Sequence, residues 1–294
     1  MQAMNRPHEE IVQANGVDLC VESFGDPDDP AILLIMGSSA SMDWWEDEFC
    51  ERLAAGPRFV IRYDQRDTGR SVSYEPGAPR YAFEDLVADA VGLLDTFSLA
   101  SAHLVAISMG GAIAQLVALD HPDRVASLTL ISTGPASPGP DDPDLPTMSE
   151  ETVARFAEAP EPDWSDRAAV IDHTVHLARV SAGSVPPFDE AAFRDLAGRV
   201  FDRTVNIAST MKNHNAIDGG DRWRNRLGEL SMPTLVVHGT EDPVVPYGNG
   251  IALANEIPGA ELLTLEGTGH ELPRAVWDVV VPAILEHTAK PARG

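Results

Sequence analysis

One stretch, Val105-Ala-Ile-Ser-Met-Gly-Gly111, joins a predicted buried strand directly to a predicted helix. The small residues around Ser108 allow a sharp strand-to-helix turn that exposes the serine hydroxyl, as in a nucleophile elbow. N–H groups at the start of the helix would favour negative charge beside that hydroxyl. The residue two before the serine is Ala106 rather than glycine, and its side chain is small enough for the turn to form. The alternative interpretation of Ser108 is an ordinary helix N-cap.

Short apolar runs on both sides of this stretch predict further strands, with amphipathic helices between them. The run Ala31–Met36 is continuously apolar, as expected for a strand covered on both faces. Similar runs lie at 58–63, 102–107, 126–131, 234–238 and 261–265, and residues 83–97 have helical apolar spacing. This alternation predicts an α/β fold with a mostly parallel, doubly wound sheet that has helices on both faces. Asn15-Gly16, between two strand-like runs at 11–14 and 17–23, predicts an antiparallel hairpin at the N-terminal edge.

The alternation stops between residues 134 and 230. Residues 134–146 are rich in proline, and helical patterns without strands follow at 152–159, 167–180 and 190–201. We therefore expect a core of residues 1–133 and 231–294 and an inserted helical cap of residues 134–230.

The amino-acid composition argues against several kinds of binding partner and site. The 294 residues include 46 acidic and 21 basic side chains, so the formal net charge is −25. A surface this acidic repels phosphate backbones and anionic lipids, which argues against nucleic-acid and membrane partners. Cys20 and Cys50 form no CxxC pair, which argues against a disulfide scaffold or a cysteine zinc site. The first residues lack an apolar targeting core, and no stretch is apolar enough to span a membrane, so we expect a soluble cytoplasmic protein.

Nine histidines are candidates for the base that a nucleophilic serine needs. His270 lies in the glycine-rich segment Gly267–His270 after the last predicted strand, where an open parallel sheet displays its active groups. His238 and His103 lie within predicted strands, and we interpret both as structural. The cap histidines His173, His176 and His214 could line a pocket, and we prefer to interpret them as surface or packing residues.

An acid must orient the histidine and stabilise its protonated form. Asp242 leaves the strand at 234–238 and stands directly before Pro243, and we prefer it to the neighbouring Glu241. The chain order Ser108, Asp242, His270 is the order that this sheet architecture uses. These are the expected catalytic residues.

Backbone N–H groups are expected to hold the negative oxygen that develops when the serine attacks a carbonyl. One should follow the nucleophile, at Met109, and the other should lie in the loop after the Ala31–Met36 strand, at Ser38. Gly37 allows the backbone to approach a ligand closely, so it is a predicted substrate-binding residue.

These residues together resemble the α/β-hydrolase superfamily over nearly the whole chain. The segments that carry the resemblance are Met36-Gly37, Arg62–Ser71, Ser108–Gly111, Gly239–Pro243 and Gly267–His270. More narrowly, Leu33–Gly37, Trp45–Cys50 and Arg62–Ser71 look like esterases of aromatic polyketide tailoring, such as the aclacinomycin methylesterases. The sequence departs from that family at Ala106 and Ser38, where the family has glycine.

The resemblance implies a serine carboxylesterase that cleaves a methyl ester, or a lactone, of a bulky polyketide such as an anthracycline, in an antibiotic-biosynthesis setting. It implies no metal and no organic cofactor, and a small-molecule ester as the partner of a monomer or homodimer. The expected pocket residues are large apolar side chains, with Trp44, Trp164 and Trp223 as the principal candidates.

Several other functions stay open at this point. Bacterial macrolide esterases share several of the same segments, and a cofactor-free perhydrolase would use the same triad. Cofactor-free carbon–carbon cleavage is a further possibility, and serine at position 108 disfavours a dehalogenase. Acidic residues in the cap, such as Glu161, leave an aminopeptidase open. A non-catalytic small-molecule-binding protein on this fold is the alternative from another class.

Overall fold

A computed structural model of the chain describes residues 8–135 and 142–290. Residues 1–7, to which the expectation about a targeting segment applies, and residues 136–141 of the proline-rich loop lie outside these ranges. Within the described part of the chain, every helix is too short or too polar to cross a bilayer.

The predicted hairpin forms at the N-terminal edge of the sheet. Asn15 and Gly16 both have positive φ, 47° and 75°, as a tight two-residue hairpin turn requires. The hairpin pairs antiparallel with the next strand, and all later strands run parallel, in the order β1-β2-β4-β3-β5-β6-β7-β8. The strands are β1 (His8–Ala14), β2 (Val17–Phe24), β3 (Ala31–Ile35), β4 (Phe59–Tyr63), β5 (Ala102–Ile107), β6 (Val125–Ile131), β7 (Thr234–Gly239) and β8 (Glu261–Leu265). The fold class expected from the sequence is confirmed.

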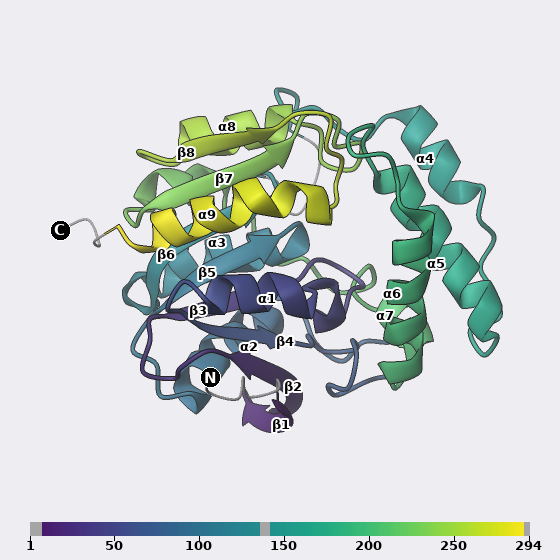
Figure 1. Ribbon diagram of the computed structural model, residues 1–294, viewed down its shortest axis with the longest axis horizontal. Coiled ribbons are helices and arrows are strands. Elements are labelled where there is room, and N and C mark those ends of the chain that lie inside the picture. The colour runs from purple at the N-terminus through teal and green to yellow at the C-terminus, as the bar shows by residue number, and fades with distance from the viewer. Residues whose placement is uncertain (1–7, 136–141, 291–294) are drawn as a thin grey trace.

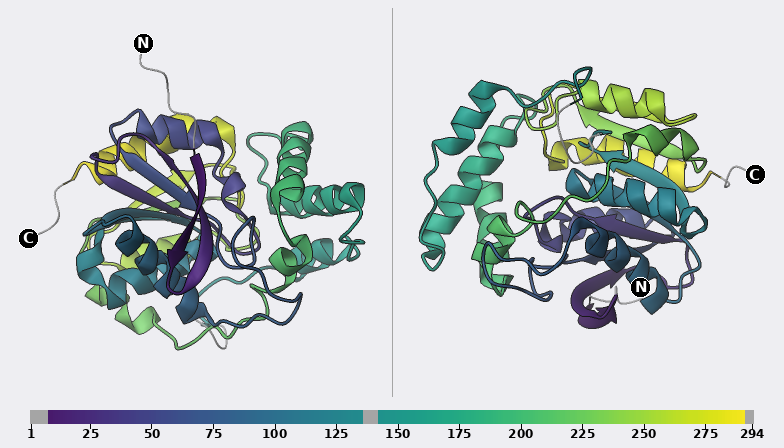
Figure 2. Two further views of the ribbon diagram at one scale, coloured as in Figure 1. Left: turned by 90° about the horizontal axis from the view of Figure 1, so that it is seen from below. Right: turned by 180° about the vertical axis from the view of Figure 1, so that it is seen from behind.

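Helices cover both faces of the sheet, as Figures 1 and 2 show. Helices α1 (Asp47–Ala54) and α9 (Trp277–Thr288) pack on one face, and α2 (Phe83–Thr96), α3 (Met109–Asp120) and α8 (Gly248–Glu256) pack on the other. The central strands β3, β4 and β5 are buried along their whole length, which explains their continuous apolar sequences.

The remaining helices lie beside the carboxyl ends of the parallel strands (Figure 1). They are α4 (Glu150–Ala157), α5 (Arg167–Ser181), α6 (Glu190–Arg203) and α7 (Ile207–Lys212). The predicted helical patterns correspond to α4, α5 and α6, whereas α7 was not predicted. The division of the chain into a core and a cap of residues 134–230 stays a prediction.

Arg203 near the end of α6 attaches this helix to the strand ends. Its guanidinium contacts Asp64 at 2.7 Å, Glu9 at 2.7 Å and Asp43 at 3.1 Å. The Asp64 side chain is fully buried, and its other oxygen accepts from the Met42 N–H at 2.8 Å. A buried carboxylate without its cation is costly, so this cluster fixes α6 over the carboxyl ends of the strands.

Candidate active site

Ser108 stands in the predicted turn between β5 and α3. Its backbone has φ 54° and ψ −123°, a conformation that residues other than glycine rarely adopt. The Ser108 N–H donates to the Ile131 carbonyl at 2.9 Å, and the Ser108 carbonyl accepts from Gly111 N–H at 2.8 Å. The turn is therefore held by the end of β6 and by the first turn of α3, and it projects the hydroxyl group beyond the end of the sheet.

Close packing behind this turn explains the small residues around it. A side chain at Gly110 would place its Cβ 2.4 Å from the Ile35 carbonyl oxygen, so only glycine lets α3 approach the end of β3. Ala106 lies on β5 and is fully buried in the core. Its methyl group is accommodated there, away from the turn itself.

His270 and Asp242 lie within hydrogen-bonding distance of each other and of the serine. The Ser108 Oγ is 3.0 Å from His270 Nε2, and His270 Nδ1 is 2.8 Å from Asp242 Oδ2. Since the carboxylate can only accept, Nδ1 carries the ring proton and Nε2 is free to accept from the serine hydroxyl. The three residues predicted from distant parts of the sequence thus form one hydrogen-bonded chain, which is able to take a proton from the serine.

Asp242 is held in its ionised form. Its side chain is fully buried, and burial alone would raise the pKa of the carboxyl group. Hydrogen bonds from His238 and His270 outweigh burial, and the backbone N–H of Val245 donates to the same carboxylate, so the pKa lies below its usual value. The neighbouring Glu241 faces elsewhere, because it accepts from the N–H and the hydroxyl of Ser184.

The loop after β3 runs beside the serine. A Cβ at Gly37 would lie 3.2 Å from the Cβ of Ser108, so the loop backbone is in close contact with the turn. Ser38 follows and lines the same cavity as Ser108 and His270. Met109 is the first residue of α3, and N–H groups at this position have no partner within a helix. Both N–H groups expected to hold a negative oxygen are therefore in the neighbourhood of the serine.

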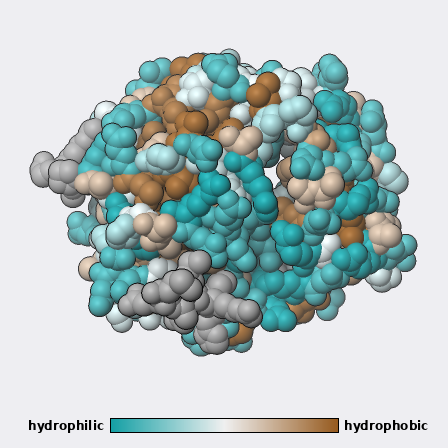
Figure 3. Space-filling model, viewed as in Figure 1, coloured by the Kyte–Doolittle hydropathy of each residue, from teal (hydrophilic) through white to brown (hydrophobic). Residues whose placement is uncertain are grey.

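A cavity of about 930 Å³ opens above Ser108 and His270. Figure 3 shows the surface hollowed between the body of the molecule and the helices α4–α6, with hydrophobic residues (brown) beside the hollow. The aromatic residues of the wall are Trp44, Trp45, Phe156, Trp164, Phe188 and Phe193. Trp44 and Phe188 both contact the ring of Phe193, with centroids 6.1 and 4.7 Å away, so one wall is a continuous aromatic surface.

The structure corrects one of the three predicted tryptophans. Trp44 and Trp164 line the cavity, but Trp223 does not. Trp223 is buried in the core, its ring is stacked on Phe83 at 6.0 Å, and its indole N–H donates to Gln115 at 3.1 Å. It lies in the predicted cap segment by sequence, yet it packs against the helices of the sheet.

Sequence reasoning missed most of the polar wall of the cavity. Arg274 pairs with Glu46, and Lys212 pairs with Glu161 at 2.5 Å; all four residues line the cavity. Each ion pair joins segments that are far apart in the chain, so no local sequence pattern predicts it. The pairing of Glu161 also occupies one of the acids on which the aminopeptidase alternative depended.

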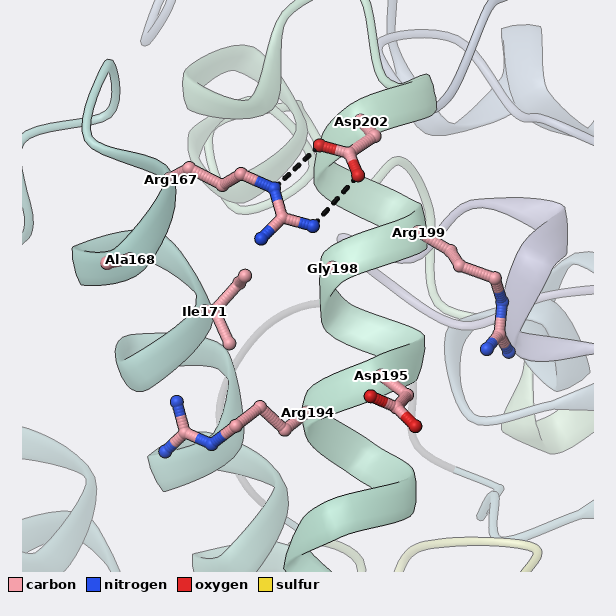
Figure 4. A pocket seen from close by; sticks show the side chains of 8 residues that line it. All are labelled: Arg167, Ala168, Ile171, Arg194, Asp195, Gly198, Arg199 and Asp202. Carbon is pink, nitrogen blue, oxygen red and sulfur yellow. Dashed lines mark hydrogen bonds and ion pairs between the residues drawn. The ribbon is translucent and has the colours of Figure 1, made fainter.

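A second, smaller hollow lies between α5 and α6 (Figure 4). It measures about 360 Å³, and none of its lining residues lines the large cavity. Arg167 pairs with Asp202 at 2.7 Å, and Arg194 pairs with Asp172 at 2.5 Å. These ion pairs connect the two helices. Within residues 8–135 and 142–290, no three His, Cys, Asp or Glu side chains are grouped to hold a metal ion.

The family of this chain follows from its similarity to known proteins. The alpha/beta hydrolase fold family matches residues 30–273. The chain belongs to the alpha/beta hydrolase fold family.

Two curated relatives of this α/β hydrolase carry the name rhodomycin D methylesterase. DauP of Streptomyces sp. (strain C5) is 34% identical, over 95% of this chain and 97% of the relative. DnrP of Streptomyces peucetius is 35% identical, with the same coverage. Both findings agree with the resemblance to methylesterases of aromatic polyketides, and they confirm the expected enzyme class, a carboxylic ester hydrolase.

Solved structures show the same fold. The enol-lactonase of Burkholderia xenovorans LB400 superimposes with a TM-score of 0.74 at 24% identity, over 96% of this α/β hydrolase and 100% of the lactonase. A bromoperoxidase of Bacillus anthracis gives a TM-score of 0.76 at 20% identity, over 96% and 100% of the two chains.

Proposed function

We propose that this α/β hydrolase is a serine carboxylesterase that cleaves the methyl ester of a bulky polyketide such as an anthracycline. The observation that carries the proposal is the chain of hydrogen bonds Ser108–His270–Asp242 at the floor of an aromatic cavity. The two methylesterase relatives support the choice of a methyl ester, and their names refer to rhodomycin D.

Ser108 Oγ attacks the ester carbonyl while His270 Nε2 takes the hydroxyl proton. Negative charge develops on the carbonyl oxygen, where the N–H groups of Ser38 and Met109 donate to it. The tetrahedral intermediate collapses as His270 returns the proton to the leaving methanol, which leaves an acyl-enzyme on Ser108. His270 then deprotonates a water molecule, which attacks the acyl group, and His270 returns the proton to Ser108 Oγ as the acyl–serine bond breaks and the free acid departs. Asp242 orients His270 and stabilises its protonated form in both halves of the reaction.

The cavity supports a large, flat substrate. Its volume of about 930 Å³ is large enough for a drug-sized ligand, and such ligands favour apolar, aromatic walls. Trp44, Phe193 and Phe188 form one such wall. Aromatic rings stack favourably on polycyclic ligands, so this wall would contact the ring system while the ester reaches Ser108.

A substrate panel tests the proposal. A methyl-esterified anthracycline, a 16-membered macrolide and a short p-nitrophenyl ester should be incubated with wild type and Ser108→Ala, with methanol and acid products measured. We expect methanol and the free acid from the anthracycline, no turnover by Ser108→Ala, and fluorophosphonate labelling of wild type alone. Opening of the macrolide alone would favour a macrolide esterase.

Two other results would contradict the esterase. Binding of the anthracycline without turnover or labelling would indicate a small-molecule-binding protein. Formation of peracid from hydrogen peroxide and acetate, without ester hydrolysis, would indicate a perhydrolase on the same triad.

A further inference from the structure

His214 connects two loops that meet beside the candidate active site. It follows α7 and is buried, with 5% of its surface exposed. The Ser39 N–H donates to His214 Nδ1 at 3.0 Å, and His214 Nε2 is 2.8 Å from the carbonyl oxygen of Arg66. The ring therefore bridges the loop after β3 and the loop after β4.

Only one form of the ring satisfies both contacts. A backbone N–H can only donate and a carbonyl can only accept, so Nδ1 must be unprotonated while Nε2 carries the proton. If Nδ1 were protonated, its N–H group and the Ser39 N–H group would both be donors, and no hydrogen bond could form between them. Burial lowers the pKa of His214, although the nearby Asp67 acts in the opposite direction, and this keeps the ring neutral. Tyr81 faces the same ring at 6.5 Å, in an edge-on contact.

The loop that His214 holds is fixed at both of its ends. The Gln65 side-chain amide donates to the Met36 carbonyl at 2.6 Å, and His214 accepts from Ser39 three residues later. Ser38 lies between these two attachments. Ser39 has a φ of 58°, a left-handed conformation that costs free energy and needs support from its surroundings. Without the His214 acceptor, the Ser39 N–H would lose its partner and the loop would be free to relax.

The same segment also forms part of the cavity wall. Met211 and Lys212 at the end of α7, and Asn215 next to His214, line the cavity. His214 therefore joins the wall of the binding cavity to the loop that carries Ser38.

We propose that His214 is a positioning residue that holds the Ser38 N–H in place to receive the negative oxygen of the tetrahedral intermediate. The inference rests on the proposed ester hydrolysis and adds to it a residue that does not touch the substrate. Removing a donor of this kind costs about 10²- to 10³-fold in kcat, so displacing one should cost less, roughly 10- to 100-fold.

Two variants of His214 separate its hydrogen bonds. His214→Leu removes both, whereas His214→Asn places an amide oxygen near the position of Nδ1 and keeps an acceptor for Ser39. We expect kcat of His214→Leu to fall by roughly 10- to 100-fold with KM within about twofold of wild type, and His214→Asn to recover most of the loss. Concentrations of active enzyme should be set by fluorophosphonate titration, so that loss of folded protein does not count as loss of rate.

A trifluoromethyl ketone analogue of the substrate gives a readout that a purely structural role would not change. Its adduct with the serine carries the negative oxygen, so its inhibition constant should rise by the same factor as kcat falls. His176→Leu is the matched control, because it removes a histidine-to-carbonyl hydrogen bond, to Arg155 at 2.8 Å, away from the loop. It should leave kcat and the inhibition constant unchanged.

The outcomes separate this inference from the proposed function. If wild type hydrolyses esters through Ser108 and titrated His214→Leu keeps its kcat and inhibition constant, the inference is overturned and the esterase stands. Equal losses in His214→Leu and His214→Asn would also overturn it, because the acceptor for Ser39 would then be irrelevant. If wild type shows no hydrolysis that depends on Ser108, the proposed function fails and the inference fails with it.

Discussion

His238 Nε2 lies 3.4 Å from Asp242 Oδ2, the same oxygen that His270 Nδ1 contacts at 2.8 Å. The Nε2 atom carries a proton, because it also lies 2.7 Å from the Val245 carbonyl oxygen, which can only accept. The ring is fully buried, and a Cβ at Gly250 would lie 2.5 Å from its Nδ1 atom. The place of His238 in a strand indicates a structural role, and the structure adds to it a contact with the acid of the candidate triad.

Replacing His238 should therefore affect the reaction through Asp242. His238→Leu removes a donor that lowers the pKa of Asp242, so that pKa should rise. The carboxylate would then be protonated at a higher pH, and the acid limb of the kcat/KM profile should move to higher pH. At neutral pH we expect a loss of about tenfold in kcat, or ~1.4 kcal/mol. His238→Gln, which retains a donor near the position of Nε2, should restore the wild-type profile, and an unshifted acid limb in His238→Leu would refute this role.

The two neighbouring acids Asp242 and Glu241 make a matched pair. Asp242→Asn keeps the shape of the side chain but favours the wrong tautomer of His270, so we expect kcat to fall by about 10³- to 10⁴-fold. Glu241→Gln should stay within about threefold of wild type, because Glu241 contacts Ser184 and not the histidine. Steady-state kinetics of both variants on one ester measure these changes in kcat. Comparable losses of kcat in both variants would contradict the assignment of Asp242 as the acid of the triad.

The sequence predicted best those features of the fold and the site that depend on short, local residue patterns. Asn15-Gly16 specifies its own turn, continuous apolar runs specify buried strands, and a serine directly between strand and helix specifies the sharp turn at Ser108. Parallel strands bring their carboxyl ends together, so three segments distant in sequence were expected at one edge of the sheet. The hydrogen bonds among Ser108, His270 and Asp242 agree with that reasoning.

Features that depend on packing between distant segments were not predicted. Helix α7 has only six residues, too few for a clear apolar period, although Asn206 caps it by accepting from Ser209 N–H. The position of Trp223 depends on Phe83, from a distant part of the chain. The sequence around His214 does not indicate its bridging role, because its hydrogen-bond partners, Ser39 and Arg66, lie in separate loops. Composition placed aromatic residues in the cap segment but did not determine which of them line the cavity.

Trp44 and Trp223 should behave differently on substitution because one lines the cavity and the other lies in the core. Trp44→Ala should raise KM for a polycyclic methyl ester by about tenfold, since it removes part of the aromatic wall. The effect on a short p-nitrophenyl ester should be smaller. Trp223→Ala should instead lower the free energy of unfolding by roughly 3–5 kcal/mol, as expected for a buried tryptophan. Denaturant titration and kinetics on both variants check this, and an equal KM effect for the two substrates would contradict the role of Trp44.

Ala106 stands where the resemblance to known esterases implies glycine, and its burial predicts the effect of placing glycine there. The methyl group is fully buried in the core, and glycine would also make the unfolded chain more flexible. Ala106→Gly should therefore lower the free energy of unfolding by about 1–2 kcal/mol, while kcat stays within about twofold of wild type. Chemical denaturation measures the first effect and initial rates the second. An activity gain of tenfold or more would show that alanine distorts the turn at Ser108.

His103 should make the protein less stable in mild acid. Burial lowers the pKa of this histidine to about 4, against about 6.5 for an exposed histidine, and its Nδ1 contacts the Ser127 hydroxyl at 2.8 Å. Between these two pKa values the unfolded chain binds a proton that the folded chain does not, so stability is complete above pH 6.5 and is lost as the pH falls toward 4. From pH 7 to pH 5 this one group should remove about 2 kcal/mol from the free energy of unfolding. In His103→Gln, the free energies of unfolding at pH 7 and at pH 5, measured by denaturant titration, should differ by about 2 kcal/mol less than in wild type. Buried histidines whose charge does not act on His103, such as His214, contribute equally in wild type and variant and so cancel in the comparison. An identical pH dependence in wild type and variant would mean that His103 takes up its proton in the folded state.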